Sequence, residues 1–222
     1  MLTVTEAVRS RRSVRAFLPD PVPLATLERV FEAARWAPSG CNYQPWEGTV
    51  LTGAPLDALQ DKMRGAPPQD PPEYDWSAPG KHDAYAARLN AVSAAMYGAQ
   101  GIVREDKAAR WAFIGQNLVS FGAPALLLVH FPRFMGPPQW SDVGMWLQTI
   151  MLLLREEGLD SCPQEYLWMH ARLIKEHIGI DDATHIFFCG LAIGRRDPDA
   201  PVNGFERERL PVEEHVRFVG WE

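Results

Sequence analysis

Four short segments of this sequence combine residue types that can bind anions or hold a flat ligand. The first, residues 9–15, reads Arg-Ser-Arg-Arg-Ser-Val-Arg and carries four arginines in seven residues. Guanidinium groups present forked donors that match phosphate oxygens, and serine adds a hydroxyl. The alternative is a solvated helix end, where cations interact favourably with the helix dipole. Because the chain as a whole is acidic, the local excess of arginine favours an anion site.

The other three segments are weaker signals when each is taken alone. Residues 37–46 read Ala-Pro-Ser-Gly-Cys-Asn-Tyr-Gln-Pro-Trp, which is either a rigid turn or a way to hold backbone amides against a flat ligand. Residues 160–165 read as an ordinary helix–strand connection. Residues 190–196 have a G-x-x-x-G spacing but lack the third glycine and the opening helix of a dinucleotide fingerprint, and Arg207 and Arg209 follow downstream.

Composition excludes several classes of protein. The chain has 222 residues, with 22 Lys and Arg against 28 Asp and Glu, and a net charge of −6. This balance argues against binding to a nucleic-acid backbone, which needs a broad basic face. The longest apolar stretch, residues 144–154, is too short to span a membrane. We therefore expect no nucleic-acid or membrane partner.

The cysteines and the N-terminus predict a cytoplasmic location. The three cysteines are widely spaced, and residues 1–10 contain no apolar signal-peptide core. No C-x-x-C or H-E-x-x-H pair occurs, so no metal site is expected.

These segments must be positioned by a set of elements that apolar periodicity predicts. Thr3 and Glu6 form a capping-box pattern that opens a helix over 4–10, and Pro23 opens a second helix to about residue 34. Later helices are predicted over 55–64, over two stretches within 81–121, and over 141–157 with Ser141 and Asp142 as the cap. Strands are predicted over 49–51, 124–131 and 185–193, with a short strand-like piece at 216–219.

Two stretches are unusual. Residues 65–80 hold five prolines, which predicts an irregular insertion or lid rather than a packed element. The helix at 141–157 is apolar on nearly all sides, so we expect it to be buried on every side, in part against another subunit. Helices that alternate with a few apolar strands predict one α/β or α+β domain spanning residues 1–222.

Taken together and in order, the four segments resemble one family, the FMN-dependent nitroreductases. Residues 11–17 look like its R-x-S-x-R-x-F signature, and residues 38–46 look like its P-S-x-x-N-x-Q-P-W turn. Residues 163–165 are similar to its flavin-facing loop, and residues 194–211 to its phosphate-side region. The resemblance implies an α+β fold of three layers (α/β/α), with a mixed, mainly antiparallel central sheet flanked by helices. It also implies an intertwined homodimer with two FMN sites at the interface.

The resemblance assigns roles by position. Arg11, Ser13 and Arg209 would hold the FMN phosphate side, with Arg12 and Arg207 beside them, while Arg15 would lie at the pyrimidine edge of the ring. Residues 163–165 would lie along the isoalloxazine, with a backbone N–H near residue 165 donating to N5, and residues 38–42 would come from the other subunit. The cofactor-binding residues predicted in this way are Arg11, Arg12, Ser13, Arg15, Pro38, Ser39, Asn42, Gln148, Pro163, Gln164, Glu165, Arg207 and Arg209.

The implied reaction is a ping-pong transfer of electrons from NADH or NADPH, through FMN, to a nitroaromatic or quinone acceptor. No catalytic side chain is required, because flavin N5 carries the chemistry. Tyr74, Trp76, Tyr85 and Trp111 are candidates for the substrate wall, with ordinary packing as the alternative. Other readings remain open: a reductive dehalogenase, a flavin-cleaving enzyme, or an FMN-binding module without turnover. Cys162, a poor hydrogen-bond donor just before Pro163, favours two-electron chemistry over dehalogenation.

Overall fold

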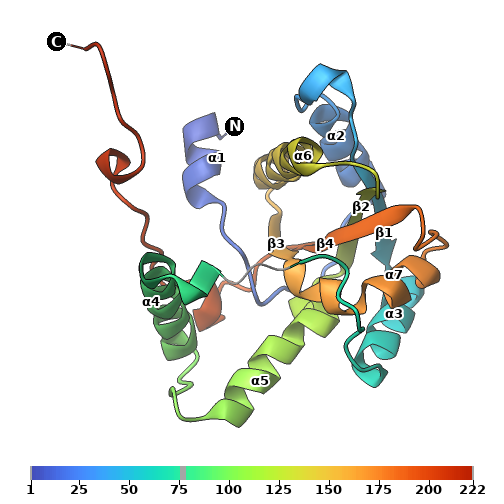
Figure 1. Ribbon diagram of the computed structural model, residues 1–222. Helices are drawn as coiled ribbons and strands as arrows, with labels where there is room; N and C mark the ends of the chain where they lie inside the picture. The colour runs from blue at the N-terminus through green and yellow to red at the C-terminus, as the bar shows by residue number, and fades with distance from the viewer. Residues whose placement is uncertain (1, 76–78, 222) are drawn as a thin grey trace.

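The computed structural model describes residues 2–75 and 79–221, and a four-stranded antiparallel sheet lies at its centre (Figure 1). The strands are β1 (Glu47–Thr52), β2 (Ala125–Pro132), β3 (Asp160–Gln164) and β4 (His185–Gly194). Their order across the sheet is β1-β2-β4-β3. The sequence predicted the three apolar strands, and the structure lengthens the first of them.

Helices cover both faces of the sheet, which confirms the predicted three layers (Figure 1). On one face, Leu127, Val129 and Phe131 of β2 pack with α2 (Leu24–Ala34) and α6 (Pro137–Glu156). On the other, Leu126 and Leu128 pack with α3 (Gly53–Gly65) and α7 (Ala171–His177). Strand side chains alternate between the faces, so the continuous apolar run of β2 serves two cores at once.

The remaining helices lie outside these two layers. The first, α1 (Val4–Ser10), begins with the predicted capping box, in which Thr3 Oγ1 accepts from Glu6 N. The helices α4 (Asp83–Ala99) and α5 (Lys107–Gly115) are the predicted pair within 81–121, and they stand away from the sheet in Figure 1. Tyr85, Leu89 and Val92 of α4 are each about half exposed. Within the described residues, no helix is both long enough and apolar enough to cross a membrane.

The structure corrects the predicted start of the long apolar helix. α6 begins at Pro137 rather than at Ser141–Asp142, and Gln139 Oε1 accepts from the N–H of Gly136 at its N-terminus. Proline suits the first turn of a helix because an N–H there has no acceptor within the helix, so the N–H that proline lacks is not missed. Met145 of α6 is 39% exposed in the single chain, so burial of this helix on every side depends on the expected second subunit and stays a prediction.

Two strand predictions were also wrong. Residues 160–164, read as a connection, form the edge strand β3, which pairs with β4 from Asp160↔Gly194 to Gln164↔Gly190. Residues 216–219 are not a strand: they lie in an exposed C-terminal tail that extends away from the sheet in Figure 1, where they have no strand edge to pair with. In both cases, whether the segment becomes a strand depends on a sheet edge with which it can pair, rather than on its local composition.

The proline-rich stretch has no helix or strand over residues 66–75, and parts of it pack against the body of the protein. Gln69 N donates to Met169 O at 2.7 Å, and the Tyr74 hydroxyl donates to Phe188 O at 2.9 Å. The side chain of Glu73 is 2% exposed. Tyr74 therefore packs against the body of the protein, whereas the predicted wall residue Trp76 lies outside the described residues.

Candidate functional site

The arginine-rich segment after α1 is held in an extended conformation against the edge of the sheet. Ser13 forms a parallel bridge with Ser161 of β3, and Val14 N donates to Ser161 O at 3.1 Å. Val14 is fully buried, in a small cluster with Cys162. Because side chains alternate along extended chain, burial of Val14 directs Ser13 and Arg15 to the opposite side.

A buried asparagine that the sequence analysis did not single out fixes this segment. Asn203 Oδ1 accepts from Arg15 N at 2.9 Å, and its Nδ2 donates to Ala16 O and Asp197 O. Asn203 is 5% exposed. In the sequence it reads only as a turn residue after a proline, so local pattern gives no signal for its role.

The structure gathers arginines from both ends of the chain. Arg207 Nη1 donates to Arg11 O at 2.6 Å, and its Nη2 donates to Arg9 O at 3.1 Å. Arg12 donates to Phe205 O, and its guanidinium lies 5.3 Å from the centre of the Phe205 ring. The C-terminal stretch 205–209 is thereby held beside the predicted anion-binding segment, as the sequence analysis required.

The arginines of this cluster lower one another's pKa values. Burial, together with Arg209, lowers the pKa of Arg11. Burial and the charges of Arg12, Arg11 and Arg209 lower the pKa of Arg207 to about 10. Like charges held this close disfavour one another, and an anion bound among them would relieve the repulsion.

The carboxylate that acts on Arg12 is that of Asp160, which already binds two other arginines. Asp160, which is 3% exposed, accepts from Arg155 at 2.7 Å and from Arg196 Nε at 2.8 Å. Arg12 Nε is buried without a hydrogen-bond partner among residues 2–75 and 79–221. An orphaned donor inside an excess of positive charge fits a bound phosphate group.

Strand β3 leads away from this cluster, and its last two residues, Pro163 and Gln164, belong to the segment predicted as a flavin-facing loop. Gln164 is 1% exposed, and its Nε2 donates to Asn117 O at 2.9 Å. Its Oε1 is buried and accepts from no donor in the described part of the chain. Pro163 is half-buried and Glu165 is exposed at the start of a short 3-10 helix over Glu165–His170. A buried amide oxygen that lacks a donor fits a ligand that brings an N–H.

Cys162 lies directly before this loop as a buried thiol. It is 1% exposed, and its Sγ lies 3.7 Å from Pro163 O. Burial raises the pKa of the thiol to about 11, although Arg15 and Arg11 act in the opposite direction.

The turn over residues 38–44 has a strained backbone. Cys41, Asn42 and Gln44 have φ values of 49°, 57° and 47°, in the left-handed region that favours glycine. The turn is held by Asp142, whose two oxygens accept from Gly40 N at 3.2 Å each, and by Ser39 Oγ, which accepts from Gln44 N at 3.0 Å. Strain of this kind is typical of ligand-binding turns.

One chain does not bring this turn to the arginine cluster. The turn is bound to Asp142 near the beginning of α6, whereas Arg155, near the end of α6, contacts Ser10 and Asp160. The thirteen residue steps from Asp142 to Arg155 correspond to about 20 Å of helix. Gln148 lies half-buried between them. Within one chain, Pro38, Ser39 and Asn42 therefore lie apart from the arginine cluster.

Comparisons with known proteins match this chain along most of its length. A family model described as the nitroreductase family matches residues 8–195. The chain is 36% identical over 218 residues to a 4-nitrobenzoate reductase of Pseudomonas putida, with 97% of this chain and 95% of that protein covered. It is 30% identical over 220 residues to a chloronitrobenzene nitroreductase of Comamonas testosteroni, with 97% and 96% covered.

Solved structures extend the likeness to three dimensions. The FMN and NADPH-dependent nitroreductase NfnB of sphigopyxis sp. strain HMH superposes with a TM-score of 0.94 at 46% identity, covering 99% of this chain and all of that one. The FMN-dependent nitroreductase NfnB of Mycobacterium smegmatis, solved in complex with NADPH, superposes with a TM-score of 0.89 at 29% identity, with 97% of each chain covered.

Proposed function

Because this chain belongs to the nitroreductase family, we propose that it is an FMN-dependent oxidoreductase that uses NADPH or NADH to reduce nitroaromatic or quinone acceptors. The observation that carries the proposal is the unbalanced arginine cluster, which contains an orphaned donor and lies beside the flavin-facing loop. Relatives matched along nearly the whole chain are named as nitroaromatic reductases, which supports the substrate class.

In this proposal the phosphate side of FMN is bound by Arg11, Arg12, Ser13, Arg207 and Arg209. The first three lie on the extended segment after α1, and the tail brings Arg207 against Arg11 and Arg9. Arg209 is near enough to Arg11 to lower its pKa. Forked guanidinium donors from two directions suit a group with several charged oxygens.

The ring side of FMN would lie along Arg15 and the segment Pro163–Gln164–Glu165, where β3 ends. When bound, FMN supplies the exchange of electrons between NADPH and the acceptor. Arg15 stabilises negative charge on the reduced ring, and Asn203 holds the backbone of Arg15 in place. Gln164, anchored on Asn117, offers its free oxygen to a ligand N–H. No side chain of the site has to act as a nucleophile or base.

The thiol before the loop favours this reaction over reductive dehalogenation. Cys162 is fully buried and its Sγ is directed to Pro163 O, so it has no hydroxyl-like donor to offer a flavin. This supports two-electron reduction as the reaction of the site.

The functional unit in this proposal is a homodimer. The exposed surface of the chain is 13174 Å², whereas a compact monomer of this mass exposes about 10,000 Å². Apolar residues are uncovered on α4, on α6 at Met145, and along the tail at Phe218 and Val219. A second chain would cover these residues, and it would also bring Pro38, Ser39, Asn42 and the helix with Gln148 to the FMN site.

Two further parts of the proposal concern organisation and location. We propose that residues 1–222 form one domain, with 65–80 as an insertion in which Tyr74 packs on the body of the protein. A cytoplasmic location is supported by Cys41, Cys162 and Cys189, which are all free thiols.

The test is to purify the protein, measure FMN per chain, and follow NADPH oxidation with and without a nitroaromatic acid. We expect one FMN per chain, loss of the flavin's visible absorbance on anaerobic addition of NADPH, and its return on addition of 4-nitrobenzoate. A colourless protein that takes up no FMN would refute the proposal. A yellow protein that NADPH does not bleach would instead be a binding module without turnover.

A further inference from the structure

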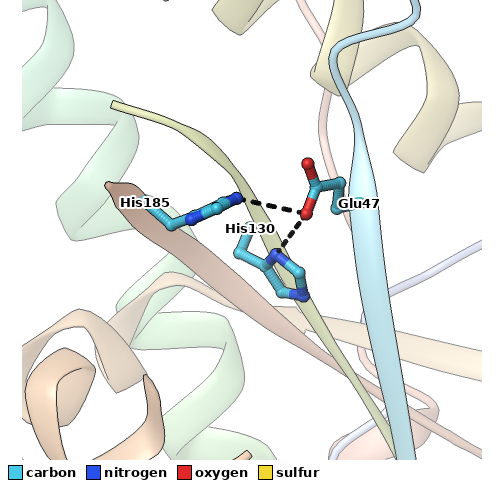
Figure 2. A group of neighbouring side chains, drawn as sticks. All are labelled: Glu47, His130 and His185. Carbon is cyan, nitrogen blue, oxygen red and sulfur yellow. Dashed lines mark ion pairs between the residues drawn. The ribbon is translucent and has the colours of Figure 1, made fainter. Parts of the chain in front are cut away.

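Three side chains that the sequence analysis did not connect meet at one end of the sheet. Figure 2 shows Glu47 of β1, His130 of β2 and His185 of β4 directed toward one another. Glu47 Oε2 lies 3.4 Å from His130 Nδ1 and 3.3 Å from His185 Nε2. All three of these ligand-type atoms lie within 4.8 Å of one another.

The strand register explains why the three residues meet. Glu47 pairs directly with His130, and His185 pairs with Pro132, two residues further along β2. Side chains two residues apart share a face of a strand, so all three emerge on the same side of the sheet. A register shift at Val129/His130 adds a local bend, and such irregularities often re-aim a side chain.

Hydroxyl groups behind both imidazoles orient the rings. His130 Nε2 lies 3.3 Å from Thr49 Oγ1, and His185 Nδ1 lies 2.9 Å from Thr184 Oγ1. If each of these nitrogens carries the proton and donates to its hydroxyl, the lone pairs of His130 Nδ1 and His185 Nε2 face Glu47. His130 is 4% exposed, and its Nδ1 has no hydrogen-bond partner within the described residues.

We propose that Glu47, His130 and His185 form a binding site for a divalent transition-metal ion of the zinc type. Two imidazole nitrogens and one carboxylate oxygen are a donor set that zinc accepts, with water in the fourth position. Zinc–ligand bonds of about 2.0–2.1 Å in a tetrahedron separate neighbouring ligand atoms by about 3.3–3.4 Å. Both distances from Glu47 match this separation, whereas Ca²⁺ and Mg²⁺ prefer oxygen ligands throughout.

The surroundings are those of a metal site. Ligating histidines usually donate their second N–H to a neighbouring acceptor, as Thr49 and Thr184 allow here. The side chains of Glu47 and His185 are 46% and 24% exposed, so an ion can reach the site from solvent. The nearby cation Lys175 is already paired with Glu73 and Asp182, each at 2.6 Å.

This site is separate from the proposed FMN site. His185 begins β4, and Gly194, which pairs with Asp160 beside the arginine cluster, ends it. The nine residue steps from His185 to Gly194 span about 30 Å of strand. The metal would therefore tie the start of β1 to the end of β2 and the start of β4, and it would take no part in flavin chemistry.

The direct experiment is a calorimetric titration, in which Zn²⁺ is added to the FMN-loaded protein after treatment with a chelator. We expect one Zn²⁺ per chain, with X-ray absorption showing nitrogen and oxygen ligands at about 2.0–2.1 Å and no sulfur. Glu47→Gln and His185→Ala should each weaken binding at least 100-fold. Thr49→Val keeps a β-branched strand residue but removes the acceptor, and should weaken binding about 10- to 100-fold. His215→Ala, which removes an exposed histidine of the tail, is the matched control and should bind as the parent does.

Several results would overturn the proposal. These are the absence of Zn²⁺ binding, binding that survives Glu47→Gln and His185→Ala, and sulfur ligation, which would assign the ion to the exposed Cys41. FMN content and circular dichroism check that each variant is folded. If Glu47→Gln or His185→Ala fails to fold, Thr49→Val and the absorption spectrum of the unaltered protein decide the matter. FMN loading and NADPH oxidation report separately on the proposed function.

Discussion

At the residue scale, the guanidinium groups around the phosphate position dominate the binding site. Arg11 is partly buried beside Arg209, and its backbone oxygen accepts from Arg207. We expect Arg11→Ala to remove charge-assisted hydrogen bonds that contribute about 1.5–3 kcal/mol, which corresponds to roughly a 10- to 150-fold weaker affinity for FMN. Fluorescence titration of the apoprotein with FMN measures this loss.

Arg64→Ala is the control for this variant. Arg64 lies on α3 and pairs with Asp61 on the surface, so its removal should leave FMN affinity unchanged. Equal affinities for Arg11→Ala and the parent protein would remove Arg11 from the phosphate site.

Arg15 is expected to act on the electronics of the flavin rather than on its retention. Its Nη1 donates to Ser13 O at 3.3 Å, and Asn203 holds its backbone. A fixed positive charge at the pyrimidine edge stabilises the reduced ring more than the neutral oxidised ring, and only that difference shifts the potential. We expect Arg15→Gln to keep FMN but to lower its midpoint potential by tens of millivolts, because about 1.4 kcal/mol corresponds to roughly 30 mV for two electrons.

The measurement for Arg15→Gln is equilibration with a reference dye, together with stopped-flow reduction by NADPH. Slower reduction should accompany the lower potential. If Arg15 is merely a surface charge, both quantities will equal those of the parent protein.

At the scale of elements, a buried ion cluster fastens the proline-rich segment to α7. Lys175 Nζ, fully buried, donates to Glu73 Oε1 at 2.6 Å and to His185 O at 3.1 Å. Lys175→Met would leave the buried carboxylate of Glu73 with less compensation, and removing one partner of such a pair costs about 3–5 kcal/mol. We expect a loss near the lower end, because Arg133 and Phe187 N also donate to Glu73. Urea unfolding measures it.

Lys62→Met is the matched control, because Lys62 is exposed on α3 and should change the free energy of unfolding little. Equal stability of Lys175→Met and Lys62→Met would show that the cluster does not hold the segment in place.

The same cluster predicts a pH dependence. The hydrogen bond from Lys175 lowers the pKa of Asp182. A carboxylate with a lowered folded-state pKa contributes stability that is present above its unfolded pKa of about 4 and is lost as the pH falls through the folded value. We expect Asp182→Asn to be less stable than the parent at pH 6, and this difference to disappear as the pH falls well below about 4. Urea midpoints over this range measure the effect, and a difference that persists in acid would contradict it.

At the scale of the whole molecule, the shape of one chain indicates that two copies associate to form the binding site. The tail and α4 extend away from the sheet in Figure 1, and the strained turn at residues 38–44 lies at the far end of α6 from the arginines. We expect a dimer that buries more than about 2,000 Å². Sedimentation at low concentration should show this dimer with FMN bound.

A charge on the exposed side of α6 tests the interface. Met145→Arg should lower both the dimer fraction and FMN content, because the two depend on the same partner chain. An FMN-loaded monomer at low concentration would contradict both the interface and the shared site.

Local sequence determined much of this protein. The capping box of α1, the apolar run of β2 and the arginine-rich segment at 9–15 each rest on neighbouring residues, so helix, strand and anion-site predictions could be made from them. The family motifs predicted the three layers for the same reason, because they are short and lie in order along the chain.

Other features depend on contacts between distant residues, and only the tertiary structure decided them. β3 is a strand because β4 offers it an edge, and Asn203 is a positioning residue because it reaches Arg15, 188 residues away. Glu47, His130 and His185 carry no common spacing, and only the pairing of three strands places them on one face. Register is a property of the assembled sheet, and a shift of one residue would turn these side chains to the other face.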